Sequence, residues 1–167
     1  NQFISKKSKP NILDKHLVKN NSKIEKEYGK EFYISKKDYQ KYWMPVRDRK
    51  QIERKGTDGF TYLWAEGKMT PWDYRNRPSR TIITSEGGKS ASRTKHIVKV
   101  NGKIRRLLPI ELEKLDMFPD DFTKYGLDEE SKISIPNNKR AFLMGNALVV
   151  GVIEKIGKNL MKAINER

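Results

Sequence analysis

Alternating apolar and polar positions predict several short strands in this chain. The runs 95–100 and 103–107 alternate in this way, and Asn101-Gly102 between them suits a two-residue type I′ turn, so we predict a hairpin there. The alternation at 60–64 predicts a half-buried strand, and the β-branched run 80–83 predicts another. Runs this short favour a small irregular sheet.

Helical spacing begins at Pro109. We expect a helix that stops before Pro119 and buries Leu112, Leu115 and Phe118.

The C-terminal part of the chain predicts two further helices after a polar linker over 126–138. Asn138 is placed to cap a short helix over 139–144, which Gly145-Asn146 should interrupt. A longer helix over 147–165 has an apolar face made of Val149, Val152, Ile153, Ile156, Leu160 and Ile164. If the rest of an enzyme does not cover that face, the helix exposes an apolar stripe. Such a stripe predicts self-association or binding to a partner chain.

The N-terminal part is rich in lysine, asparagine and aromatic residues. Residues 1–22 are interpreted as a tether followed by a short docking helix, with a frayed terminus as the alternative. For the aromatic residues of 24–44 and 56–78 we favour a place in the core over base stacking. The cationic cluster 47–55 and the tripeptide Arg75-Asn76-Arg77 are each either a solvated surface or a set of phosphate contacts.

Composition narrows the possible partners and chemistry. The 167 residues include 36 Lys and Arg against 21 Asp and Glu, a net charge of +15, so a polyanion is the expected partner. There is no cysteine, and His16 and His96 are the only histidines, so disulfides are excluded and no metal site is expected. No apolar run is long enough to cross a bilayer and no signal peptide opens the chain, so we expect no membrane partner and a cytoplasmic protein.

Hydroxyl and cationic residues alternate in the loop that precedes the predicted hairpin. Between 84 and 95 they include Ser85, Lys89, Ser92 and Arg93, opposed by Glu86 alone. Such side chains donate hydrogen bonds to phosphate oxygens and base edges. The adjacent glycines 87 and 88 allow either a positive φ or a very close approach of the backbone to a ligand.

Two later stretches carry a family resemblance. RRLLPIELEKLDMFPDDF, from Arg105, resembles the ninth conserved motif of bacterial and phage DNA cytosine-5 methyltransferases. RAFLMGNALVV, from Arg140, is similar to the tenth motif of that family, a Gly-Asn pair followed by a small residue and valines. The resemblance covers residues 78 to 167, whereas 1–77 match no motif.

The resemblance implies a role for each residue around the loop. Thr81-Ile82 takes the place of the family's Thr-Leu pair, whose threonine grips a phosphate, and 84–95 corresponds to the loop that reads bases in the major groove. Arg93 is the first choice as base reader, since arginine to guanine is the commonest specific contact. Glu86 is expected to cap a turn, and His96 to be structural. The predicted DNA-binding residues are Arg80, Thr81, Ser85, Lys89, Ser92, Arg93, Lys95 and Arg105.

The resemblance also implies S-adenosylmethionine as cofactor, with Asn146 and the backbone of Ala147 near its carboxylate. The family's nucleophile is a cysteine thiolate, and this chain has none, so we expect no catalytic residue here and no activity from the chain alone. A start at Asn1 suggests a piece cut from a longer polypeptide; the second subunit of a split enzyme is the other possibility.

The predicted fold class is α+β: a small irregular target-recognition domain of short strands and loops, then a C-terminal helix that packs on a Rossmann-like catalytic domain absent from this chain. The expected divisions are 1–22, a tether and docking segment; 23–125, the target-recognition domain; and 126–167, a linker and helix of the catalytic domain. We expect sequence-specific recognition of double-stranded DNA for a restriction-modification or phage cytosine-5 methyltransferase, in partnership with its catalytic portion or subunit. The alternatives are a noncatalytic DNA-binding module and an RNA- or ribosome-binding protein.

Overall fold

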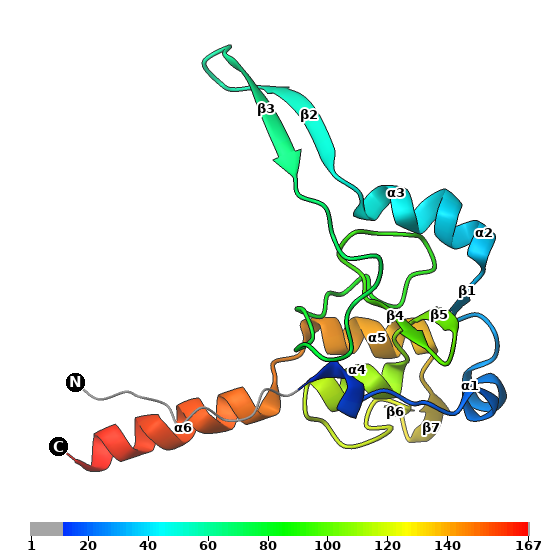
Figure 1. Ribbon diagram of the computed structural model, residues 1–167. Helices are drawn as coiled ribbons and strands as arrows, with labels where there is room; N and C mark the ends of the chain where they lie inside the picture. The colour runs from blue at the N-terminus through cyan, green and yellow to red at the C-terminus, as the bar shows by residue number, and fades with distance from the viewer. Residues whose placement is uncertain (1–11, 167) are drawn as a thin grey trace.

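The computed structural model describes residues 12–166, which form an α+β fold around a three-stranded antiparallel sheet (Figure 1). Its strand order is β1-β5-β4, with β1 at Tyr33–Ile34, β4 at Ile97–Val100 and β5 at Lys103–Arg106. The predicted hairpin is confirmed as β4 and β5. Asn101 and Gly102 both have positive φ, 47° and 77°, as a type I′ turn requires.

The main core lies where β4 meets α4 (Pro109–Leu115) and α5 (Asn137–Asn146). The N-terminal segment docks on it through a 3-10 turn at Leu13–Lys15. Leu13 is buried in this core, and its N–H donates to Arg77 O at 2.8 Å. Residues 1–11 of the predicted tether lie outside the described residues. The buried members of this core are Leu13, Leu17, Val98, Val100, Leu107, Leu112, Ala141 and Met144.

A second core confirms the interior placement of some aromatic residues. Tyr28 of α1 (Asn21–Tyr28) and Phe32 pack with Ile24, Leu108 and Ile110. Three consecutive helical turns follow β1: α2 (Lys36–Asp38), the π-helical η2 (Tyr39–Trp43) and α3 (Met44–Arg47). Among their rings Trp43 is buried, whereas Tyr42 is about half exposed.

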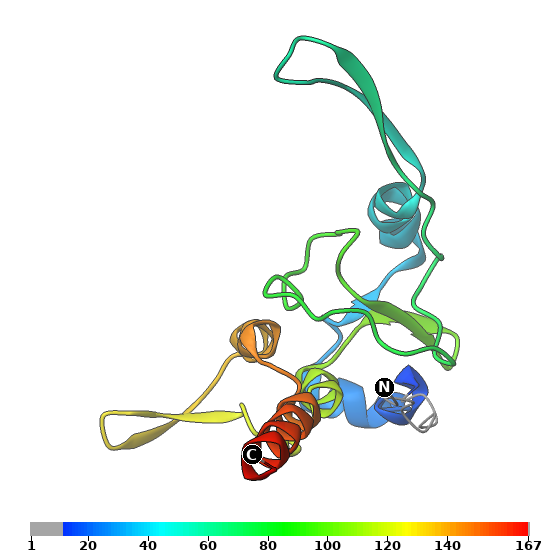
Figure 2. The same cartoon turned by 90° about the vertical axis from the view of Figure 1, so that its left-hand side faces the viewer.

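Two hairpins leave the body in different directions (Figure 2). The first pairs β2 (Lys50–Lys55) with β3 (Thr61–Glu66), and the second pairs β6 (Tyr125–Asp128) with β7 (Ser131–Ser134). The predicted strand at 60–64 is therefore confirmed, but its half-buried status is wrong: Phe60, Tyr62 and Leu63 are exposed, because nothing packs on either face of β2 and β3 in the described residues. The β6–β7 hairpin occupies the segment that we predicted to be a linker.

The C-terminal helices differ from the prediction at their boundary. Asn138 does not cap a helix, since α5 begins at Asn137, two residues earlier than predicted, with Pro136 in the cap position. Gly145-Asn146 does not interrupt the helix but forms its last two residues. Helix α6 (Val150–Asn165) confirms the predicted long helix; it runs away from the body, and none of its residues is buried (Figure 1). No helix in the described part of the chain combines the length and hydropathy that crossing a bilayer requires.

The predicted strand at 80–83 does not form. These residues belong to no strand: the Arg80 side chain bonds to a carbonyl of the loop, and Ile82 packs on the main core.

Candidate nucleic-acid interface

A buried carboxylate, Asp73, closes the base of the basic loop. Its oxygens accept hydrogen bonds from Arg47 Nη2 at 3.0 Å, Arg80 Nε at 2.6 Å and the N–H of Ile97 at 3.0 Å. Burial would raise the pKa of Asp73, but the hydrogen bonds from Arg80 and the charge of Arg47 hold it below its usual value. Arg80 also donates to Thr94 O at 3.1 Å, so the same guanidinium ties the start of the loop to its end.

A second buried pair, Glu86 and His96, fixes the first turn of the loop. Glu86 Oε1 accepts the His96 backbone N–H at 2.6 Å and lies 3.0 Å from His96 Nδ1, while Ser79 Oγ lies 3.1 Å from Nε2. Both side chains are almost completely buried. Contrary to the prediction, Glu86 therefore does not cap its own turn but binds His96, ten residues further along the chain, and the buried His96 is structural as predicted.

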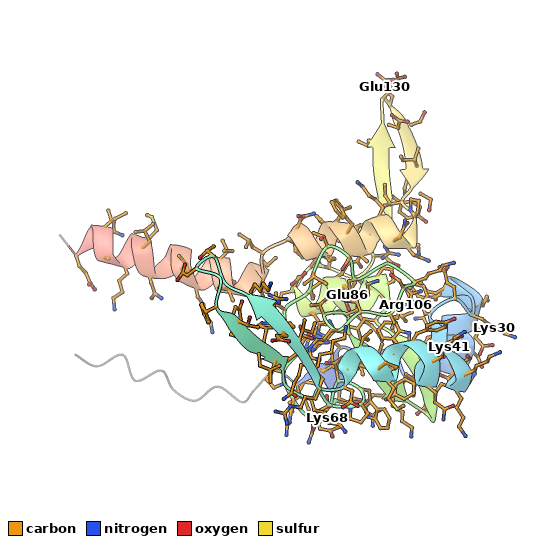
Figure 3. The ribbon with its side chains drawn as sticks, turned by 90° about the horizontal axis from the view of Figure 1, so that it is seen from above. Lys30, Lys41, Lys68, Glu86, Arg106 and Glu130 are labelled. Atoms are coloured by element: carbon orange, nitrogen blue, oxygen red, sulfur yellow. The ribbon has the colours of Figure 1, made fainter. Side chains whose placement is uncertain are left out.

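The paired glycines lie against the protein itself. Neither has a positive φ, and a Cβ on Gly87 would lie 2.8 Å from the backbone of Asn138 in α5. Arg106 Nη1 donates to the carbonyls of Gly87 and Gly88 at 2.9 and 3.2 Å, and the two glycines are half-buried. Because glycine has no side chain, the loop backbone can pack directly against α5 here. Figure 3 labels Arg106, which binds the glycine carbonyls, beside Glu86 within the body.

The predicted base reader, Arg93, spans the base of the β2–β3 hairpin. Its guanidinium donates to the carbonyls of Val46 at 3.4 Å, Asp48 at 3.1 Å and Gly67, and lies 3.6 Å from Glu66. These partners lie on both sides of the hairpin. Arg93 therefore joins the chain entering the hairpin to the chain leaving it.

Two other predicted residues are buried and paired. Lys95 Nζ donates to Gly88 O at 3.1 Å and Ser90 O at 2.8 Å, and burial together with the charge of Arg106 lowers the pKa of Lys95. Arg105, with no exposed surface, pairs with Glu111 at 2.6 Å. Both side chains organise the loop and the motif that follows it.

The remaining predicted residues lie at the surface. Thr81 and Ser85 are exposed, and so is Lys89, whose Nζ lies 3.1 Å from Glu31. Ser92 is half-buried, with its Oγ 2.9 Å from Thr94 Oγ1. The structure thus divides the predicted set into three groups. Arg80, Arg93, Lys95 and Arg105 build the loop, Thr81, Ser85 and Lys89 face solvent, and Ser92 is half-buried.

The β2–β3 hairpin is a candidate surface that sequence reasoning missed. The sequence pattern predicts its cations as a separate cluster over 47–55 and its aromatic residues as a single strand over 60–64. Two signals together point to the hairpin: alternating positions at 60–64 and the glycines that flank Thr57-Asp58. Arg47, the first cation of the cluster, is instead buried against Asp73.

The predicted cofactor residues lie where α5 ends. Asn146 is exposed, and its Nδ2 donates to Phe142 O at 3.2 Å, which leaves the second amide hydrogen for a ligand. The N–H of Ala147 is already used, because it donates to Met144 O at 3.0 Å. Ala147 helps to line a groove of about 420 Å³ between the 78–82 segment, the end of α4 and the start of α6.

Comparison with known proteins agrees with the motifs. The family model described as C-5 cytosine-specific DNA methylase matches residues 2–162. The chain is also 40% identical over 117 residues to the Type II methyltransferase M.Sau3AI of Staphylococcus aureus, a match that covers 70% of this chain and 26% of that protein. The chain therefore spans about a quarter of the relative's length. No solved structure matches. Since the family model covers nearly the whole sequence, the chain belongs to the C-5 cytosine-specific DNA methylase family.

Proposed function

We propose that this chain is the DNA-recognition part of a cytosine-5 methyltransferase of the restriction-modification type. The observation that carries the proposal is how the loop is held: the carboxylates of Asp73 and Glu86 bind Arg80 and the His96 N–H, while Thr81, Ser85 and Lys89 face solvent on a chain of net charge +15. Preorganised donors on a basic surface suit a duplex, because little ordering is needed on binding.

The exposed residues divide the work of recognition. Thr81 donates to a backbone phosphate and sets the register, whereas Ser85 and Lys89 reach base edges. Arg80, Arg93, Lys95 and Arg105 act as positioning residues, since their donors already bind groups of the protein. In this proposal Ser85 and Lys89 contact the bases in place of Arg93, the first choice from the sequence.

The methyl transfer itself requires groups from outside this chain. The chain has no cysteine to attack the flipped cytosine, so the nucleophile belongs to the catalytic portion or subunit. S-adenosylmethionine supplies the methyl group when bound. Asn146 fits a role in holding its carboxylate through the free amide hydrogen, but the N–H of Ala147 does not fit, because Met144 O already accepts it.

The division of the chain follows from this proposal. In it residues 23–125 form the target-recognition domain, 126–167 form a linker and a helix of the catalytic domain, and 1–22 form a tether and docking segment. Support comes from α6, whose apolar residues are all exposed, since a surface of this kind is normally covered by a partner. The partner in this proposal is the Rossmann-like catalytic domain.

Selection from a pool of random duplexes tests recognition directly. We expect the 167-residue chain to enrich one short sequence, and Lys89→Ala with Ser85→Ala to reduce that enrichment while keeping the fold, since both side chains are exposed. Lys155→Ala with Ser131→Ala is the control, because it removes the same groups from exposed positions elsewhere. A chain that bound all duplexes equally would contradict sequence-specific recognition.

A second measurement tests whether the catalytic groups lie outside this chain. The chain alone, incubated with DNA and labelled S-adenosylmethionine, should transfer no methyl group. Transfer by the isolated chain would overturn the proposal that the chemistry lies elsewhere.

A further inference from the structure

The β2–β3 hairpin projects from the body with both faces open to solvent (Figure 1). Every residue of β2 is exposed, and in β3 only Trp64 and Glu66 are half-buried. An isolated two-stranded hairpin is marginally stable in water, and exposed rings add to its cost. A hairpin of this kind is therefore expected to bind a partner.

The strand register gives the two faces different chemistry. Ile52 lies opposite Trp64 and Arg54 opposite Tyr62, so their side chains share one face. On it the Arg54 guanidinium lies 4.1 Å from the centre of the Trp64 ring, and Phe60 lies 5.6 Å from Tyr62 between ring centres. The other face carries the more polar set Gln51, Glu53, Lys55, Thr61, Leu63 and Ala65.

The base of the hairpin is held firmly although its tip is free. Arg93 binds carbonyls on both sides of the base, and the N–H of Met69 donates to Arg47 O at 2.9 Å. Arg47 is itself buried against Asp73. The same cluster that closes the basic loop therefore fixes where the hairpin emerges.

The charges of the hairpin point to duplex DNA as the partner. Arg49, Lys50, Arg54 and Lys55 have no carboxylate partner among the described residues. Of the acidic residues, Asp48 and Glu66 are paired with Lys68 and Arg93, whereas Glu53 and Asp58 are exposed and form no ion pair there, so unpaired cations outnumber unpaired carboxylates by four to two. A two-stranded ribbon is narrow enough for a major groove, and cations beside aromatic rings suit phosphates and exposed bases. A second copy of the chain fits poorly, because it presents the same unpaired cations.

We propose that the β2–β3 hairpin is a second DNA-contact element, which grips the duplex beside the site addressed by the loop at 84–95. Arg54 and Lys55 contact phosphates, the aromatic face lies against sugars and base edges, and Arg93 is the positioning residue at the base. The inference rests on the proposed function. According to this inference, the hairpin increases the affinity for DNA, and the loop at 84–95 determines the sequence specificity.

The test compares the salt dependence of duplex binding for two double variants of the 167-residue chain. Arg54→Ala with Lys55→Ala should weaken binding roughly tenfold or more at 0.1 M salt and reduce the slope of log K against log salt by about 1.8, or about 0.9 per lost phosphate contact. Lys132→Ala with Lys155→Ala makes the same change in net charge at exposed positions outside the hairpin and should leave the slope close to wild type. Circular dichroism checks that both variants remain folded.

The outcomes separate this inference from the proposed function. If the hairpin variant binds weakly but still enriches the wild-type sequence, both proposals stand. A wild-type slope in the hairpin variant overturns the role of the hairpin and leaves recognition by the loop intact. If both double variants lower the slope equally, the charge effect is general and the hairpin has no special role. A wild-type chain that binds no duplex overturns both proposals.

Discussion

The two projecting hairpins, β2–β3 and β6–β7, are built alike and carry opposite chemistry. Each stands on a buried arginine–carboxylate pair: Arg47 with Asp73 at 3.0 Å below β2–β3, and Arg140 with Glu113 at 2.8 Å below β6–β7. In each, a cation lies over a ring.

Their exposed charges differ. The first strand of β2–β3 carries Lys50, Arg54 and Lys55 against Glu53, with one acidic residue, Asp58, in its turn. The tip of β6–β7 carries three, Asp128 at the end of β6 and Glu129 and Glu130 in the turn (Figure 3 labels Glu130 at that tip). The buried pairs therefore fix where a hairpin stands, and the exposed residues decide what it can bind. Three adjacent carboxylates at the tip of β6–β7 repel phosphate, whereas the cations of β2 attract it, so the β2–β3 hairpin suits DNA better.

The largest effect is expected from breaking either buried pair. Asp73→Ala leaves the buried Arg47 without a carboxylate, and Glu113→Ala leaves the buried Arg140 with Asp121 alone, so each should lower the free energy of unfolding by about 3–5 kcal/mol. Urea denaturation measures this, with the exposed Asp58→Ala as control. A loss in only one of the two variants would show that the hairpins are not anchored equivalently.

Another buried carboxyl gives the next largest expected effect on stability. Asp116, at the end of α4, has an oxygen without a partner among the described residues, and burial raises its pKa to about 6. The native state then binds a proton more tightly than the unfolded chain, whose pKa is 3.8, so stability falls as pH rises from about 4 to 6. Asp73 has a lowered native pKa, so its contribution is instead lost as pH falls below 3.8.

Asp116→Asn should therefore raise the free energy of unfolding at pH 7 by about 2 to 3 kcal/mol and remove the decline between pH 4 and 6. Urea denaturation across that range is the measurement. An unchanged pH profile in the variant would mean that another group causes the decline.

Arg93→Ala tests how the β2–β3 hairpin is attached. We expect little change in global stability but a DNA affinity about tenfold lower, because the hairpin loses contacts at Val46, Asp48 and Gly67. If Arg93 acts through the hairpin, its effect should be largely absent when Arg54 and Lys55 are already alanine. Fully additive losses would instead indicate that Arg93 contacts DNA directly.

The smallest expected effect on stability gives the most direct comparison of the two hairpins. Arg54→Ala and Lys132→Ala each remove a cation that lies about 4 Å from a ring centre on an exposed hairpin, so each should cost about 0.5 kcal/mol of stability. Only Arg54→Ala should weaken duplex binding, as measured by titration with a labelled duplex. Equal binding losses would remove the distinction between the hairpins.

Local elements were predictable where neighbouring residues decide them. Asn101-Gly102 determines its own turn, Pro109 begins α4, and the apolar spacing of α6 needs no partner to be visible. The β6–β7 hairpin escaped prediction, because its strands are polar and mostly exposed and have little apolar alternation.

The sequence by itself determined the family, the basic character of the chain, and the absence of a thiol nucleophile, since these depend only on which residues are present and in what order. Only the tertiary structure decided which cations are free. Arg93 finds its carbonyl partners 26 to 47 residues away, and Arg47 finds Asp73 at a separation of 26. A guanidinium that meets buried acceptors must bind them, because leaving them unpaired is costly, and no local pattern records which distant groups will meet.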